Sequence, residues 1–139
     1  MVNSTETFFT SVGCMDGRVQ GPVLRFGQDK FGARFADTIT EAGLVGQLSR
    51  DQVDQQLRNS LMEKLEISIK KHNSRGIIVH GHQDCAGNPV SDDVQRDDIR
   101  RSVTFIKTLV GSSVTIIGVF VWQKGLEWIA EEVPQTLTA

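Results

Sequence analysis

The sequence predicts an α/β fold: a mostly parallel sheet with helices on its faces and an antiparallel edge strand at the C-terminal end. Three observations lead to this fold class. Short apolar runs alternate with segments of helical periodicity along the 139 residues, an order that favours a parallel, helix-covered sheet. The strongest apolar run is followed by a glycine-containing turn and a weaker strand. No repeat or linker divides the chain, so residues 1–139 are expected to form a single domain.

The first third of the chain is expected to hold two strands and a helix. The short apolar run 8–12 predicts the first strand. Pro22 suits the first position of a helix, where a backbone N–H has no partner within the helix, and Gly32 is expected to end that helix. Residues 34–40 predict a second strand, and the polar, glycine-bearing stretch 40–46 predicts a loop.

A long amphipathic helix is predicted from Ser49 to about Asn73. Ser49 and Gln52 have the spacing of a capping box, in which each side chain pairs with the backbone N–H of the other residue. Apolar side chains then recur every four residues and form one stripe. They are Val53, Leu57, Leu61, Leu65 and Ile69. This helix is expected to cover one face of the sheet.

The second half of the chain predicts two further strands, a helix and the antiparallel edge. A strand is expected at 76–80, because the short apolar run 77–79 is bounded by glycines. Residues 91–111 predict a helix, because a serine and two aspartates suit its N-terminus and a glycine suits its end. The β-branched run 114–121 predicts the strongest strand. A turn at 123–125 and a return strand at 126–130 follow.

Composition and charge narrow the class of partner and the compartment. A net charge of −2 and a pI near 5.9 give no electrostatic basis for binding nucleic acid or an anionic membrane. No apolar run is long enough to cross a bilayer, and the basic and apolar regions of a signal peptide are not seen. With only two cysteines, we expect a cytoplasmic protein with reduced thiols.

Three candidate metal ligands follow two of the predicted strands. Cys14 comes directly after the first strand, and His82 and Cys85 lie three residues apart after the third. Ligands of such sheets bind beyond the carboxyl ends of the strands, so we expect these side chains to meet. Three protein ligands leave one tetrahedral position open, which distinguishes catalytic zinc from structural zinc. The pattern predicts one Zn²⁺ per chain and a zinc lyase or hydrolase.

Asp16 and Arg18 are the expected catalytic pair beside this metal. Two thiolate ligands donate charge and make a zinc-bound water less acidic, so a nearby proton acceptor is useful. Asp16 lies two residues after Cys14, and Arg18 can hold its carboxylate bidentately and keep it ionised. Asp16 is then an orienter of the zinc hydroxide or a proton acceptor. Alternatively, it is a fourth ligand that closes the site.

The remaining candidates have structural interpretations. His80 is a rival ligand, although strand alternation favours a packed or hydrogen-bonded histidine. His72, near a helix end, is expected to be solvated or to interact with the helix dipole. Asp84 is expected in a turn, and Trp122 and Trp128 are expected to pack across the hairpin. A metal-free interpretation also stays open, in which the two cysteines form a disulfide or pack in the core.

The two cysteine-containing motifs resemble those of the β-class carbonic anhydrases. The segment Cys14-Met-Asp-Gly-Arg18 matches the Cys-x-Asp-x-Arg signature of that family, and His82-Gln-Asp-Cys85 matches its His-x-x-Cys signature. The likeness extends over about 8–133. It implies the β-carbonic anhydrase fold, with a small-molecule substrate and a pocket at the interface of a homodimer or a larger even homo-oligomer.

The resemblance also assigns roles to five residues. It implies that Cys14, His82 and Cys85 bind zinc, and that Asp16 and Arg18 form a dyad beside the fourth position. The implied reaction is the reversible hydration of carbon dioxide to bicarbonate by a zinc-bound hydroxide. In some members of the family the aspartate itself binds zinc in a resting state and turns to the arginine when the enzyme is active.

The sequence departs from the family pattern at several points and leaves two alternatives open. Thr40-Glu41-Ala42-Gly43 stands where the family has Arg-Asn-Ala-Gly, and the chain contains no tyrosine. One alternative is hydrolysis of carbonyl sulfide or carbon disulfide at the same site. The other is a non-catalytic, zinc-stabilised binding or assembly module, in which Asp16 or Glu41 permanently fills the fourth position.

Overall fold

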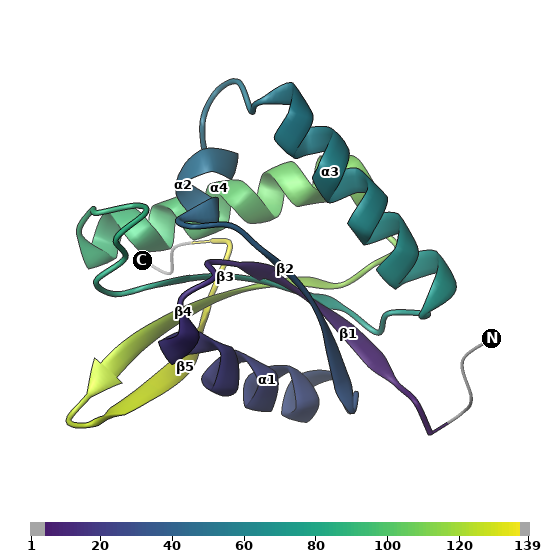
Figure 1. The fold of residues 1–139 in the computed structure, drawn as a ribbon, viewed down its shortest axis with the longest axis horizontal. Helices are drawn as coiled ribbons and strands as arrows, with labels where there is room; N and C mark the ends of the chain where they lie inside the picture. Colours follow the sequence, from purple (N-terminus) through teal and green to yellow (C-terminus); the bar gives the residue numbers. More distant parts are fainter. Residues whose placement is uncertain (1–4, 137–139) are drawn as a thin grey trace.

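A computed structural model describes residues 5–136, which form a five-stranded sheet with helices on both faces (Figure 1). The strands are β1 (Phe8–Gly13), β2 (Phe35–Thr40), β3 (Ile77–His82), β4 (Ile116–Lys124) and β5 (Glu127–Val133). Their order in the sheet is β2-β1-β3-β4-β5. All neighbouring pairs are parallel except β4 and β5, which are antiparallel. This arrangement confirms the predicted fold class.

The helices enclose the sheet and create two apolar layers. They are α1 (Gly17–Phe31), α2 (Leu44–Leu48), α3 (Gln55–Glu66), the π-helical turn η1 (Ile67–Lys71) and α4 (Asp92–Val110). Figure 1 shows α1 on one face of the sheet and α2, α3 and α4 on the other. Because side chains alternate along a strand, Ile78 of β3 packs on the α1 side while its neighbours Ile77 and Val79 pack on the opposite side. None of the helices within residues 5–136 is long and apolar enough to cross a membrane.

Helix α1 begins earlier than the sequence predicted. It begins at Gly17 and is capped by Asp16, whose side-chain oxygen accepts a hydrogen bond from the backbone N–H of Arg18 at 2.9 Å. Pro22 therefore lies inside the helix and not at its start. The predicted end is confirmed, because Gly32 closes the helix with a φ of +62°, a conformation that favours glycine.

The predicted capping box at Ser49 is wrong. Helix α3 begins at Gln55, and its cap is Asp54, which accepts a hydrogen bond from the N–H of Leu57 at 3.0 Å. The preceding region was predicted to be a loop, but it contains α2, whose apolar side chains are buried against the core. Beyond α3 the chain continues through η1 as far as Lys71, close to the predicted end.

The second half of the chain follows the prediction more closely. Ser91 caps α4 through a hydrogen bond from the N–H of Val94 at 3.3 Å, and Gly111 ends the helix. Strand β4 runs to Lys124, so the hairpin turn is shorter than predicted. Trp122 pairs with Ile129 and Trp128 with Gln123. The two tryptophans consequently lie on opposite faces of the sheet and do not pack against each other.

Candidate metal centre

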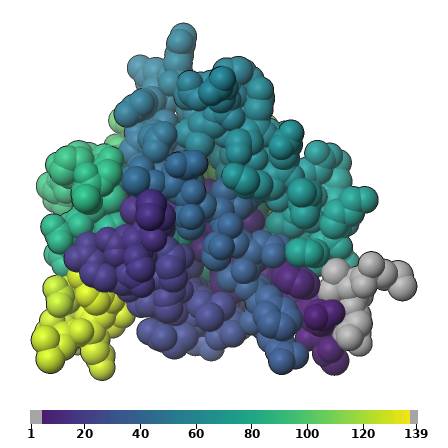
Figure 2. Space-filling view, in the orientation of Figure 1, coloured from purple at the N-terminus to yellow at the C-terminus, as the bar shows by residue number. Residues whose placement is uncertain are grey.

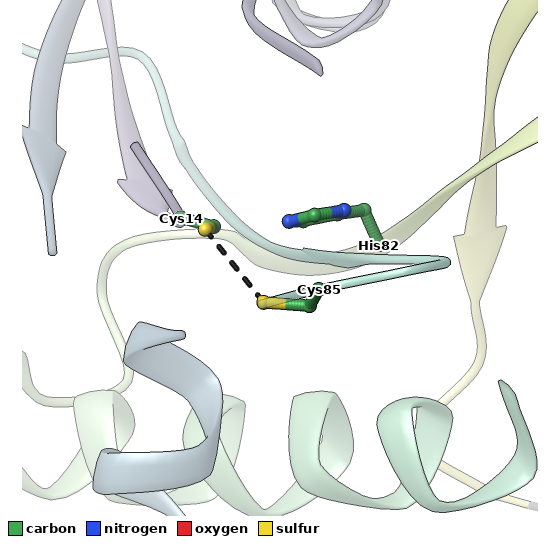
Figure 3. A group of neighbouring side chains, drawn as sticks. All are labelled: Cys14, His82 and Cys85. Carbon is green, nitrogen blue, oxygen red and sulfur yellow. Dashed lines mark hydrogen bonds between the residues drawn. The ribbon is translucent and has the colours of Figure 1, made fainter. Parts of the chain in front are cut away.

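Three side chains meet at the carboxyl ends of β1 and β3. Cys14 follows β1, His82 is the last residue of β3, and Cys85 lies in the turn that comes next. These two strands are direct neighbours, with Gly13 opposite His80. Figure 3 shows the cysteine side chains and the His82 ring pointing into one space. The structure thus brings together the three residues that the sequence predicted to meet.

The geometry of this group suits a metal ion. One ligand atom from each of Cys14, His82 and Cys85 lies within 4.8 Å of the others, and all three residues are buried. The two sulfur atoms are 3.8 Å apart, and both cysteines are free thiols. Within residues 5–136, Cys14, His82 and Cys85 are the one set of three or more His, Cys, Asp or Glu side chains that lie close enough together to hold a metal ion.

The orientation of the His82 ring is compatible with metal binding. Its Nδ1 lies 2.8 Å from the carbonyl oxygen of Gln83, which can only accept, so Nδ1 carries the proton and donates it. Nε2 then holds the free lone pair. It is buried and has no hydrogen-bond partner within the described part of the chain. A histidine fixed through one nitrogen, with the other unpaired and aimed at two sulfur atoms, is the arrangement of a metal ligand.

Electrostatic contacts favour the thiolate form of Cys14. Burial raises the pKa of this thiol, but the His82 ring and backbone N–H groups lower it more, so that the pKa is about 7. One of these groups is the N–H of Gly43, which donates to the Cys14 sulfur at 3.4 Å. Burial and the neighbouring Cys14 raise the pKa of Cys85. A metal that binds both sulfurs as thiolates must therefore displace a proton from Cys85.

Asp16 and Arg18 form a bidentate ion pair at the edge of the group. Arg18 Nε donates to Asp16 Oδ1 at 3.0 Å, and Arg18 Nη2 donates to Asp16 Oδ2 at 2.7 Å. The hydrogen bonds from Arg18 lower the pKa of Asp16 to about 2. The same carboxylate caps α1, so the start of the helix fixes its position. Asp16 Oδ2 lies 3.9 Å from His82 Nε2, which places an ionised carboxylate beside the metal group.

Arg18 has two further partners that the sequence analysis did not identify. Its Nη1 donates to Asp84 Oδ2 at 3.2 Å, and its Nη2 donates to the Asp84 backbone carbonyl at 3.0 Å. Asp84 lies in the predicted turn and has a φ of +58°. The Arg18 guanidinium carbon lies 4.5 Å from the centre of the Trp128 ring, a cation–π contact. Asp84 and Trp128 both lie far from Arg18 in the sequence, so no local sequence pattern predicts these contacts.

Close backbone packing joins the loop that carries Cys85 to Gly43, the residue before α2, whose N–H also donates to the Cys14 sulfur. A Cβ atom built on Gly43 would lie 2.4 Å from the carbonyl carbon of Gly87, and Gly43 has a φ of +62°. Both conditions require glycine at position 43. On the other side, the Gln20 side chain donates to the carbonyl oxygens of Cys14 and Asp16 at 2.8 and 2.9 Å. The loop after β1 is therefore supported from α1 and from the start of α2.

Two other candidates do not join the metal group. His80 is fully buried, packs against Gly13, and has no hydrogen bond on either ring nitrogen within residues 5–136. Burial and the charge of His82 lower its pKa to about 3, so it stays neutral. This agrees with a packed histidine and not with a hydrogen-bonded one. Glu41, a suggested fourth ligand, is exposed and lies outside the group.

His72 belongs to a second polar cluster, which corrects the prediction of a solvated residue. Its Nδ1 pairs with Asp37 Oδ2 at 2.7 Å, and its ring stacks on Phe8 with centroids 4.1 Å apart. The same Asp37 oxygen accepts a hydrogen bond from Ser68 at 2.7 Å. Ser68 in turn lies 2.7 Å from the hydroxyl of Thr10. Because η1 presents both Ser68 and the following His72 to β2, this cluster ties the edge strand to the helical layer.

A cavity borders the metal group on the side of Arg18. It has a volume of about 390 Å³ and is lined by Arg18, Asp84, Cys85, Ala86, Pro89 and Val90. The lining combines charged side chains with apolar ones. This composition and size can admit a small molecule next to the metal group.

Comparison with known proteins shows which family has this arrangement. The family model described as "Putative carbonic anhydrase" matches residues 4–133. The structure is similar to that of the β-carbonic anhydrase isoform I from Trichomonas vaginalis, with 16% sequence identity, a TM-score of 0.58, and coverage of 94% of this chain and 85% of that one. It is also similar to a β-carbonic anhydrase of Aspergillus fumigatus, with 8% identity, a TM-score of 0.63, and coverage of 96% and 78%. No curated protein matches the sequence.

At these identities the two solved structures show a shared fold, and the family match carries the assignment. That match spans nearly the whole chain, including both cysteine-containing motifs. The protein therefore belongs to the carbonic anhydrase family and has the fold of its β class.

Proposed function

We propose that this protein is a zinc enzyme that interconverts carbon dioxide and bicarbonate, with Cys14, His82 and Cys85 holding one zinc ion per chain. The observation that carries the proposal is the unpaired, buried Nε2 of His82, aimed at two sulfur atoms beside an ionised aspartate. Two sulfur atoms bound tetrahedrally at about 2.3 Å from zinc lie about 3.8 Å apart. The distance between the Cys14 and Cys85 sulfurs is 3.8 Å.

Asp16 and Arg18 supply the polar side of this site. Zinc held by three protein ligands supplies a hydroxide nucleophile near neutral pH. Asp16, with a pKa of about 2, is an acceptor throughout the neutral range and can orient a donor placed between it and the metal group. Both oxygens of this carboxylate accept hydrogen bonds from Arg18, which would favour Asp16 remaining paired with Arg18 over its binding a metal held by the three ligands. This supports an open catalytic site over a closed, purely structural one.

The oligomer and the compartment are part of the proposal. We expect a homodimer or a larger even oligomer, as the family resemblance implies, and Met15, next to a proposed ligand, is 62% exposed and apolar. Sedimentation velocity of the zinc-loaded protein tests this, and a monomer at micromolar concentration would contradict it. A cytoplasmic location is supported by the two free thiols, which a reducing compartment preserves.

Stopped-flow measurement of carbon dioxide hydration between pH 7 and 9, on zinc-replete protein, tests the activity. We expect turnover that increases with pH and that falls at least a hundredfold in Asp16→Asn. Asparagine is as good a helix cap as aspartate, so this variant keeps the start of α1 and removes only the charge. Unchanged turnover would show that Asp16 has no catalytic role.

Absence of carbon dioxide hydration by protein that contains one zinc per chain would overturn the proposed reaction. The same assay with carbonyl sulfide would then distinguish a hydrolase from a binding module. X-ray absorption at the zinc edge gives a second criterion, because a carboxylate ligand at both pH 7 and pH 9 would mean that the site is permanently closed.

A further inference from the structure

The planar guanidinium group of Arg18 is hydrogen-bonded along two of its edges and covered on one of its faces. Its Nε and Nη2 bind the Asp16 carboxylate, and its Nη1 and Nη2 bind the side chain and backbone of Asp84. Its flat face covers the ring of Trp128 at 4.5 Å. Trp128 comes from β5, at the opposite end of the chain, and reaches the first turn of α1 across the sheet face. Figure 2 shows the yellow C-terminal hairpin beside the purple and blue surface of the α1 region.

The donors of Arg18 leave little capacity for binding a substrate anion. A guanidinium has five N–H donors, and the hydrogen bonds above occupy four of them. Two carboxylates, from Asp16 and Asp84, surround its single positive charge. Arg18 is therefore better suited to fixing the Asp16 carboxylate than to attracting bicarbonate.

We propose that Trp128 is a positioning residue that, together with Asp84, fixes Arg18 and so keeps the Asp16 carboxylate off the metal. This inference rests on the proposed function. Asp16 Oδ2 is only 3.9 Å from His82 Nε2, so a rotation of the side chain could make it a fourth ligand of a metal held by Cys14, His82 and Cys85. Besides the capping hydrogen bond from the Arg18 backbone N–H, what opposes that rotation is the ion pair with the Arg18 guanidinium, which is maintained only while that side chain stays in place. Trp128 and Asp84 hold Arg18 by contacts that are independent of Asp16.

We expect the fold to tolerate a shorter side chain at position 128, because Trp128 packs at the margin of the core on the α1 side. Trp128 is partly exposed and borders a cavity of about 570 Å³ between α1 and β5, lined also by Pro22 and Phe26. Replacing Trp128 therefore removes little buried core. Trp122 provides a matched control, because it lies in the same hairpin on the opposite face, away from Arg18.

Azide binding to the cobalt-loaded protein measures how open the fourth position is, without relying on turnover. The visible absorption of Co²⁺ changes when azide occupies that position. We expect Trp128→Leu to weaken azide binding about tenfold, the size of effect that corresponds to loss of a cation–π contact. Trp128→Phe keeps an aromatic face and is expected to retain most of the affinity, and Trp122→Phe all of it. Equal azide affinity in Trp128→Leu and the unsubstituted protein would overturn the inference.

Fluorescence of the metal-free protein tests the contact itself. The chain has two tryptophans, so in Trp122→Phe the emission comes from Trp128 alone. Adding Arg18→Gln to that variant is expected to shift or brighten the emission, because the stacked cation is gone. Emission that does not respond would contradict the contact.

The proposed function and this inference fail in different ways. If the unsubstituted protein binds azide but does not hydrate carbon dioxide, and Trp128→Leu still weakens azide binding, the reaction is wrong and the positioning role stands. If the protein hydrates carbon dioxide and Trp128→Leu matches it in both turnover and azide affinity, the reaction stands and the positioning role is wrong.

Discussion

The metal group and the Asp37–His72 cluster both place a histidine near a carboxylate. Of the two, only the metal group leaves a buried histidine nitrogen without a hydrogen-bond partner among the described residues. At the second cluster, His72 and Ser68 both pair with one oxygen of Asp37 at 2.7 Å, so the histidine nitrogen that faces the carboxylate already has its partner within the protein. In the metal group, His82 has a buried nitrogen without a partner among the described residues, beside two free thiols. This difference shows that residues of metal-binding type indicate a metal site only where their ligand atoms have no hydrogen-bond partner within the protein.

Removing one sulfur from the metal group is expected to have the largest effect. Cys85→Ala leaves two protein ligands, which seldom retain zinc, so zinc content should fall from about one per chain to near zero. Elemental analysis of protein purified without added metal measures this. His72→Gln, in the Asp37–His72 cluster, is the matched control, and this variant should retain about one zinc per chain. Full metal retention by Cys85→Ala would remove this residue from the ligand set.

Disrupting the Asp37–His72 cluster is expected to lower the stability of the fold without changing metal binding. Asp37→Ala removes the carboxylate that accepts from the buried Ser68 and pairs with His72, and should lower the free energy of unfolding by about 1–3 kcal/mol. Urea unfolding of the zinc-loaded protein provides the measurement, with the exposed Asp51→Ala as control. A change in zinc content in Asp37→Ala, or no change in stability, would show that the two regions do not differ as described.

Titration of the metal-free protein gives the smallest and most specific effect. The pKa of Cys14 is about 7, whereas the pKa of Cys85 is raised above the usual 9.0. Thiolate absorbance in the ultraviolet should therefore increase in two separate steps, the first centred near pH 7. Cys14→Ser should remove that first step and leave the second. A lowered thiol pKa stabilises the fold above the unfolded value of 9.0, and this contribution is lost as the pH falls through 7.

The fold class and the metal group could be predicted because their signals are local. The apolar run that forms β1 is followed directly by Cys14, and the run that forms β3 is followed by His82 and Cys85. Parallel neighbouring strands place their carboxyl ends together, so two short motifs far apart in the chain were sufficient. The roles assigned to these residues stay predictions until the experiments above are done.

The contacts around the site could not be predicted because they depend on tertiary packing. Whether Asp16 caps a helix or lies in a loop is decided by where α1 begins, and Pro22 gave a stronger but misleading signal. The partners of Arg18 come from the turn after β3 and from β5. His72 meets Asp37 only because a π-helical turn follows α3, and no pattern in the sequence marks that turn.

Cys14 and Cys85 are 71 positions apart along the chain, with sulfur atoms 3.8 Å apart in space. A metal bound to both is a reversible cross-link, and the loop it closes includes α1, β2, α2, α3, η1 and β3. Closing a loop of this length removes chain entropy from the unfolded ensemble worth on the order of 4 kcal/mol for a permanent bond. A metal ion bound here would therefore also stabilise the fold of about half of the chain. Removing it with a chelator would lower the stability of the protein as well as stop the proposed reaction.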